Sequence, residues 1–170
     1  MVGDEAFRLA AEVQRRVKVA ITGGAAVQLL TRGQFMTMDV DLVLVDGERE
    51  EIVENTLWKL GFIRRRAYWL DKTGENLFQI VGPYFDRQDW ARYKNLRLRI
   101  SCLEYLIAFR LFKCSRGETR MCEQALYMLE EYKKDLDMPY LRELLRRFKV
   151  DESFLSKVKL KRLSVRKQER

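Results

Sequence analysis

Two aspartates are the residues of this sequence whose type and spacing first suggest chemistry. Asp39 and Asp41 lie two positions apart in an apolar, β-branched run that extends to Val45. Side chains two apart on a strand project from the same face, so the two carboxylates can converge on one or two divalent cations. Magnesium suits such a site because it takes hard oxygen ligands and usually keeps positions open for substrate phosphates, and manganese accepts the same ligands. The pair therefore predicts a metal site.

A glycine pair upstream has the position of a phosphate-binding turn. Gly23 and Gly24 follow the apolar run of residues 17–21 and precede a stretch of helix formers. Glycines between a strand and a helix let backbone amides approach a phosphate closely at the positive end of the helix. Taken alone, the glycine pair is more typical of a tight strand-to-helix turn, and the Asp-x-Asp pattern is more typical of a polar outward strand face. The fourteen residues between Gly24 and Asp39 suit one helix and a return strand, which would bring the two motifs together.

The elements that must position these motifs follow from hydrophobic periodicity. The pattern predicts helices over residues 4–16, 25–32 and 48–61 and strands over residues 17–21, 38–45, 63–70 and 77–81. On the third helix the predicted inward face consists of Ile52, Val53, Leu57 and Leu60. Gly82-Pro83 is expected to end the sheet, and the polar segment 86–95 is expected to be irregular. The order is that of a small mixed sheet with flanking helices.

The remainder of the chain is predicted to be helical. Ser101 and Glu104 have the spacing of a capping box, and Pro139 suits an early position in a later helix. Helices are expected over residues 101–113, 118–132 and 138–148. The fold class is therefore α/β (α+β), with an α/β domain over residues 1–90, a helical C-terminal region over 91–155, and a basic tail over 156–170 that is disordered or partly helical.

Composition narrows the possible chemistry. The sequence contains no histidine, which excludes Ser-His-Asp and Cys-His nucleophile systems and disfavours zinc. The net charge is +8, and residues 155–170 carry seven lysines and arginines against Glu169 alone, so the rest of the chain is nearly neutral. Such a tail can contact nucleic acid through phosphates. A third hypothesis, a plain nucleic-acid-binding module, depends on this tail alone and assigns no role to the aspartates.

The cysteines and the hydropathy pattern bear on location. Cys102, Cys114 and Cys122 are odd in number, lack a Cys-x-x-Cys spacing and lie in an apolar, helix-like region, so buried reduced thiols are expected. No apolar run has the length of a signal peptide or of a membrane span. We therefore expect a cytoplasmic protein without a membrane partner, and the sequence leaves the oligomeric state open.

The glycine and aspartate motifs together resemble a known signature. The segments ITGGAAVQLL and TMDVDLVLV resemble the Gly-Gly and Asp-x-Asp signature of the nucleotidyltransferase superfamily, which has the DNA polymerase β-like fold. More narrowly, they are similar to the minimal prokaryotic nucleotidyltransferases and to related toxin and antitoxin proteins of abortive-infection systems. The resemblance covers roughly residues 17–85, and more loosely the helical remainder.

This resemblance implies an active site and a reaction. Asp39 and Asp41 would hold magnesium, while Gly23 and Gly24 would receive the triphosphate of a nucleoside triphosphate. A nucleotidyl group would then pass to a hydroxyl acceptor on a protein, an RNA end or a small molecule, and pyrophosphate would leave.

The sequence departs from the family pattern at two positions. Thr37 matches the threonine of an Arg-x-Thr that commonly precedes the aspartates, whereas Phe35 stands in place of the arginine. In active members a third carboxylate lies on a later strand. The corresponding residue here is Gln79, whose neutral amide cannot act as a general base. Asp71 and Asp86 are the nearest alternatives, close to the ends of the predicted hairpin.

Basic and aromatic residues supply further candidates. Arg110 and Lys113 would bind the phosphates, as guanidinium and ammonium groups do, although they also suit solvated positions on amphipathic helices. Aromatic side chains gather in and after the predicted hairpin, where a base could stack on them or where they could fill the core: Tyr68, Trp69, Phe78, Tyr84, Phe85 and Trp90.

Two functions from different classes are therefore open. The first is a magnesium-dependent nucleotidyltransferase that uses a nucleoside triphosphate. The second is a catalytically degenerate nucleotidyltransferase-like protein that binds a nucleotide, RNA or a protein partner, for example in a toxin–antitoxin system. The intact glycine and aspartate pairs favour the first, whereas Gln79 and Phe35 favour the second.

Overall fold

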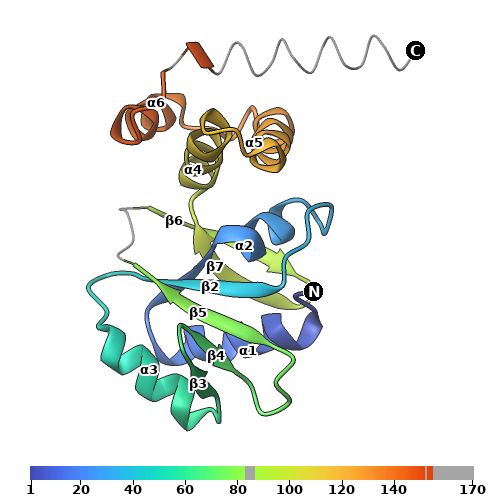
Figure 1. Cartoon of the computed structure of the whole chain (residues 1–170), viewed down its shortest axis with the longest axis vertical. Coiled ribbons are helices and arrows are strands. Elements are labelled where there is room, and N and C mark those ends of the chain that lie inside the picture. Colours follow the sequence, from blue (N-terminus) through green and yellow to red (C-terminus); the bar gives the residue numbers. More distant parts are fainter. Residues whose placement is uncertain (83–86, 152, 155–170) are drawn as a thin grey trace. The chain divides into compact units, whose positions relative to one another are not determined.

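A seven-stranded mixed sheet is the framework of the first unit of the chain (Figure 1). The computed structural model describes residues 1–82, 87–151 and 153–154. The strands are β1 (Val19–Thr22), β2 (Asp39–Leu44), β3 (Ile63–Arg65), β4 (Tyr68–Leu70), β5 (Leu77–Val81), β6 (Gln88–Tyr93) and β7 (Leu96–Ser101). Their order across the sheet is β3-β4-β5-β2-β1-β7-β6. Strand β1 pairs antiparallel with β2 and parallel with β7, and β2 pairs parallel with β5. The mixed α/β architecture expected from the sequence is confirmed.

The described residues of this unit form the helices α1 (Asp4–Arg16), α2 (Gly23–Leu30) and α3 (Glu50–Lys59). Helix α1 begins with acidic residues and ends with basic ones, as the helix dipole favours. It contacts β7, and the ring of its buried Phe7 lies 4.6 Å from that of Tyr93 on β6. Helix α2 begins at Gly23 itself, so the glycine pair opens the helix instead of preceding it. On α3 the inward-face prediction holds for Val53 and Leu57, but Ile52 is 37% exposed.

The sheet extends further along the chain than we predicted. The segment 86–95, expected to be irregular, contains β6, and a turn at Lys94 with φ 53° leads into β7. The signal for β7 was the alternation of Leu96, Leu98 and Ile100 with two arginines, which is typical of a half-exposed strand. The single strand expected over residues 63–70 is instead the hairpin of β3 and β4, which turns at Arg66 with φ 58°.

The second unit begins at Leu103 and contains α4 (Leu103–Ser115), α5 (Thr119–Glu131) and α6 (Met138–Arg147). The first unit thus ends at Cys102, whereas the α/β domain was expected over residues 1–90. The Asp137 carboxylate caps α6 by accepting the Tyr140 N–H at 3.0 Å, and buried Glu104 accepts the Asp137 N–H at 2.8 Å, which ties α4 to α6. No helix in the described ranges is both long and apolar enough to cross a membrane.

The expected capping box at residues 101–104 does not form. Ser101 is the last residue of β7, and its buried Oγ has no hydrogen-bond partner among the described residues. Glu104 contacts α6 instead of the start of its own helix. Tertiary contacts have therefore overridden a local sequence signal.

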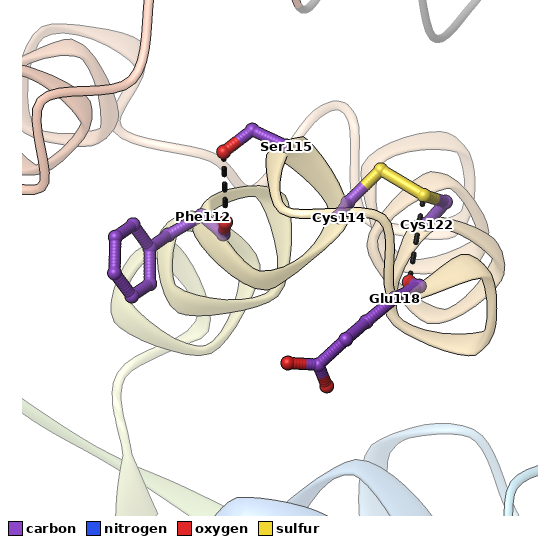
Figure 2. The surroundings of a disulfide bond; sticks show 5 residues. All are labelled: Phe112, Cys114, Ser115, Glu118 and Cys122. Carbon is purple, nitrogen blue, oxygen red and sulfur yellow. Dashed lines mark hydrogen bonds between the residues drawn. A yellow bond between two sulfur atoms is a disulfide. The ribbon is translucent and has the colours of Figure 1, made fainter.

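A disulfide joins Cys114, at the end of α4, to Cys122 in α5 (Figure 2). The expectation of three reduced thiols is therefore wrong for this pair and correct for Cys102, which is free and buried. The two cysteines are eight residues apart in the sequence, and their Cα atoms lie 4.8 Å apart. The chain reverses direction between the two helices, which the spacing alone did not indicate. An ion pair of 3.1 Å between Lys113 and Glu118 spans the same turn.

Candidate active site

The two aspartates lie on one face of β2. Asp39 and Asp41 are half-buried and alternate with fully buried Val40 and Leu42, whose side chains belong to the core. Across the antiparallel pair with β1, Asp41 lies opposite Thr22, the last residue before the glycine turn. The register therefore brings the aspartates next to the start of α2.

The glycine turn lies so close to the aspartates that only glycine fits. Gly23 has φ 61°, and a Cβ atom built on it would overlap the Asp41 carboxylate, 2.9 Å from its Cγ. A Cβ on Gly24 would lie 2.7 Å from the Cβ of Thr37. Both positions thus need a residue without a side chain. At Gly23 the reasons are the backbone conformation and the lack of space, whereas at Gly24 the reason is the lack of space alone. The result is a backbone turn in direct contact with a carboxylate-bearing strand.

Thr37 links the strand to the N-terminal segment. Its Oγ1 donates to Asp39 Oδ1 at 3.0 Å, and its N–H donates to Gln28 Oε1 at 3.2 Å. Its carbonyl accepts the Val2 N–H at 2.8 Å, while Gln28 Nε2 donates to the Val2 carbonyl at 2.7 Å. Gln28 is buried on α2 and holds both chain segments. Sequence reasoning missed Gln28, although a lone amide within an apolar helix is a signal for such a role.

Gln79 lies on β5 directly opposite Asp41 in the parallel pair. The amide therefore occupies the place next to the aspartates where the family resemblance predicts a third carboxylate. Among the described residues, no group of three or more His, Cys, Asp and Glu side chains could hold a metal ion. Two carboxylates and an amide oxygen still suit magnesium, which usually takes one or two carboxylates together with substrate phosphates. These three oxygen donors thus suit a cation that binds together with a nucleotide, whose phosphates complete its coordination. They suit less well a cation that is coordinated by protein side chains alone.

Asp71 is committed to its own loop between β4 and β5. Its buried carboxylate accepts hydrogen bonds from Thr73 Oγ1, from the backbone of Glu75, and from both the side chain and the backbone of Asn76, at 2.8–3.2 Å. Burial alone would raise the pKa of Asp71, but these hydrogen bonds, those from Asn76 foremost, lower it below its ordinary value. Asp71 therefore organises the loop. The other alternative, Asp86, lies outside the described residues.

Arg110 and Lys113 lie on α4 in the second unit. Arg110 is 3% exposed, and its Nε donates to Gln124 Oε1 at 2.8 Å and its Nη1 to the Leu106 carbonyl at 3.2 Å. Lys113 pairs with Glu118 and is partly exposed. The solvated-helix interpretation thus suits Lys113 and not Arg110. Phosphate binding by either residue stays a prediction.

The aromatic residues separate into core and surface. Phe78 and Trp69 are buried, and the Phe78 ring makes an edge contact with Phe62 at 5.0 Å between centroids, so core packing explains them. Tyr68 and Trp90 are 38% and 51% exposed. Tyr84 and Phe85 lie outside the described residues.

Comparison with known proteins identifies the fold. No model of a known family matches the chain, and no curated protein matches it significantly. Several solved structures are similar, and three of them serve as examples. The crystal structure of ANT(2″)-Ia in complex with adenylyl-2″-tobramycin shares 18% identity at a TM-score of 0.58, covering 86% of this chain and 98% of that one. The solution structure of the antibiotic-resistance factor ANT(2″)-Ia also shares 18% identity, with a TM-score of 0.57 and coverage of 85% and 90%.

A further similar structure comes from a different organism. It is an antigenic nucleotidyltransferase-like protein from Paracoccidioides brasiliensis, with 13% identity, a TM-score of 0.59 and coverage of 93% of each chain. At these identities the likeness concerns the fold, and it confirms the nucleotidyltransferase-type fold that the Gly-Gly and Asp-x-Asp motifs led us to expect.

Proposed function

We propose that this protein is a magnesium-dependent nucleotidyltransferase, which moves a nucleoside monophosphate from a nucleoside triphosphate to a hydroxyl acceptor. One observation carries the proposal: the turn at Gly23 packs directly against the Asp41 carboxylate, at the N-terminal end of α2. A backbone turn for phosphates and carboxylates for a cation thus meet in one corner of the unit. The likeness in fold to nucleotidyltransferases supports the same assignment.

Each residue of this corner has a role in the proposal. The turn of Gly23 and Gly24 would receive the triphosphate, because helix N-termini bind anions through backbone amides. Asp39 and Asp41 would hold the magnesium or manganese ion, and Thr37 would keep Asp39 in place through its hydrogen bond. The ion, when bound, neutralises charge on the phosphates and favours the departure of pyrophosphate.

The transfer balances without further reactants. The acceptor oxygen forms a bond to the α-phosphorus, and the bond from that phosphorus to the oxygen bridging the α- and β-phosphates breaks. Pyrophosphate leaves, and the hydroxyl proton passes to water, since the Gln79 amide cannot accept it. Phosphoryl-type transfer depends largely on positioning and charge stabilisation, so it can proceed slowly without a general base. The acceptor would be a hydroxyl of a protein, an RNA end or a small molecule.

A second candidate function is a degenerate protein that binds nucleotide, RNA or a protein partner without catalysis. The position of Gln79 opposite Asp41 favours it, because the third carboxylate of active members is replaced. Phe35, half-buried and held by a hydrogen bond from its N–H to Thr31 Oγ1 at 3.3 Å, supplies no charge for phosphates. A role in a toxin–antitoxin pair would belong to this alternative.

Titration calorimetry with ATP, CTP, GTP and UTP, with and without magnesium, tests the proposal. We expect magnesium-dependent binding that Asp39→Asn/Asp41→Asn loses. Glu50→Gln/Glu51→Gln is a matched control, because it removes two exposed carboxylates from the first turn of α3. Transfer of label from the α-phosphate of the bound nucleotide, and not from the γ-phosphate, then identifies nucleotidyl transfer. Nucleotide binding without any transfer of label would favour the degenerate alternative. The absence of nucleotide binding would contradict both the proposed nucleotide site and the proposed reaction.

A further inference from the structure

One face of the β6–β7 hairpin carries a tryptophan and three arginines. Trp90 lies opposite Arg99, and Arg92 lies opposite Arg97. Directly opposed residues of an antiparallel pair share a face, so all four side chains project from the same side. The middle of the other side carries buried apolar residues, Ala91 and its partner Leu98, which belong to the core.

Two of the three arginines, Arg97 and Arg99, lie over the indole ring of Trp90. The Arg97 guanidinium carbon lies 4.3 Å from the centroid of the Trp90 ring and that of Arg99 lies 5.4 Å away, while Trp90 is still 51% exposed. In the described part of the chain, no ion pair joins Arg92, Arg97 or Arg99 to a carboxylate, and the buried Nη1 of Arg99 has no hydrogen-bond partner. Among the described residues, these three arginines are therefore not neutralised by an ion pair.

This face is the one that carries the aspartates. Ile21 of β1 pairs with both Leu42 of β2 and Ile100 of β7, so these three core residues share one side of the sheet. Their neighbours therefore point to the opposite side: Thr22 and Asp41, which pair with each other, and the residues flanking Ile100, namely Arg99 and Ser101.

Ser101 and Thr22 lie between the aspartates and the tryptophan. The side chain of Ser101 is fully buried, yet its Oγ has no partner among the described residues. Strands β2 and β6 are three positions apart in the sheet, which at about 4.8 Å a strand is roughly 14 Å. Trp90 and the Asp-x-Asp pair therefore share one side of the sheet, but Thr22 and Ser101 between them are buried, so a flexible chain must pass over what covers them to reach from one to the other.

We propose that this face binds a single-stranded polynucleotide, with a base on Trp90 and phosphates at Arg92 and Arg97, and that a hydroxyl of this strand is the acceptor of the transfer. The inference rests on the proposed function for its second half only. Alternating aromatic and basic side chains are the usual platform for single strands, whose bases expose both π-faces. A duplex buries those faces, and a cationic small acceptor would be repelled by three arginines.

Fluorescence anisotropy on the full chain tests the binding, with labelled RNA and DNA single strands of about 12 nucleotides and a duplex of equal length. Trp90→Leu should weaken single-strand binding about 10-fold, the equivalent of one lost stacking contact, without changing the salt dependence. Arg92→Gln/Arg97→Gln should reduce the slope of log Kd against log salt by about 1.4, since each phosphate contact on a single strand contributes about 0.7. A clear preference for the RNA strand would identify RNA as the ligand. Equal affinities for RNA and DNA would show that the site does not contact the 2′-hydroxyl.

Two controls separate this face from other sources of charge. Arg65→Gln/Arg66→Gln removes two exposed arginines from the β3–β4 hairpin and should leave affinity and slope unchanged. Replacing the seven lysines and arginines of residues 155–170 by glutamine tests the tail, and the 10-fold effect of Trp90→Leu should persist in that background. Single-strand affinity insensitive to Trp90→Leu, or a duplex bound as tightly as a single strand, overturns the proposal.

The acceptor role is tested apart from the nucleotide site. Asp39→Asn/Asp41→Asn should leave polynucleotide affinity unchanged while magnesium-dependent nucleotide binding is lost. With labelled nucleotide, label should appear on the strand, and Trp90→Leu should raise KM for the strand with little change in kcat. If label is transferred only to another acceptor, the acceptor role of the strand is overturned and the proposed function stands. If the strand binds through Trp90 but no label is transferred to any acceptor, the proposed function is overturned and the binding face stands.

Discussion

Gln79 lies directly opposite Asp41 in the parallel pairing of β5 and β2. The amide is therefore next to the aspartate and on the same face, where a carboxylate would complete a three-acid site. An amide oxygen can coordinate a cation or accept a hydrogen bond, but it can neither carry charge nor take a proton. The chain thus keeps the geometry of such a site while lacking one of its charges, and that difference can be tested directly.

Restoring the carboxylate should raise activity. Gln79→Glu places a base beside Asp41, and we expect the rate of α-phosphate transfer to rise roughly 10²-fold, the lower end of what a positioned base contributes. Without magnesium the variant should be less stable than the natural protein, because like charges lie side by side. Gln34→Glu, the same change at an exposed position, is the control. An unchanged transfer rate in Gln79→Glu would contradict the role assigned to this position.

The glycine turn should tolerate no side chain. Gly23→Ala introduces a Cβ that overlaps the Asp41 carboxylate, and we expect magnesium-dependent nucleotide binding to be lost. Gly33→Ala is a matched control, since Gly33 also has positive φ, at 86°, but has no atom within 4 Å of the added Cβ. Both variants should lose about 1–2 kcal/mol from the backbone conformation alone, which thermal unfolding measures. Equal nucleotide affinity in the two variants would show that contact with Asp41 is unimportant.

Asp71 should affect stability and not nucleotide binding. Asp71→Asn removes a charged acceptor of several buried hydrogen bonds, so the free energy of unfolding at pH 7 should fall by about 1–3 kcal/mol. Because the pKa of Asp71 is lower in the folded chain than in the unfolded one, its contribution is present above the ordinary carboxyl pKa of 3.8 and is lost as the pH falls below it.

Urea unfolding between pH 7 and pH 2.5 checks this, since the difference in stability between the natural protein and Asp71→Asn should narrow toward the acid end. Asp135→Asn, at an exposed position in the second unit, should leave stability unchanged across the range. Loss of magnesium-dependent nucleotide binding in a folded Asp71→Asn variant would instead make Asp71 the missing third carboxylate.

The disulfide should stabilise the helical unit. Cys122→Ser, or reduction, opens a short loop with a sequence separation of eight, and the chain-entropy estimate for such a loop is about 2–3 kcal/mol. Urea unfolding with and without a thiol-free reductant measures this difference. Denatured protein should show one reactive thiol before reduction and three after it. Three reactive thiols without reductant would show that the bond does not form. Cys102→Ala should keep the full response to reductant.

Local elements were largely readable from the sequence. The opening helix, the central strands β1 and β2, and the helices α5 and α6 lie close to their predicted bounds, because a buried face recurring at helix or strand period is encoded within each segment. The Gly-Gly and Asp-x-Asp motifs are of this kind as well. They follow from residue type and spacing, and their resemblance to a known signature implied the nucleotidyltransferase-type fold.

What depends on pairing between distant segments was decided only by the tertiary structure. The contact of Gly23 with Asp41, the position of Gln79 opposite that aspartate, and the shared face of Arg99 and Asp41 all follow from strand register. Register depends on the hydrophobic patterns of both paired strands and on the turns between them, so no one segment determines it alone. The bond between Cys114 and Cys122 has the same origin, since it depends on the turn that brings two helices side by side.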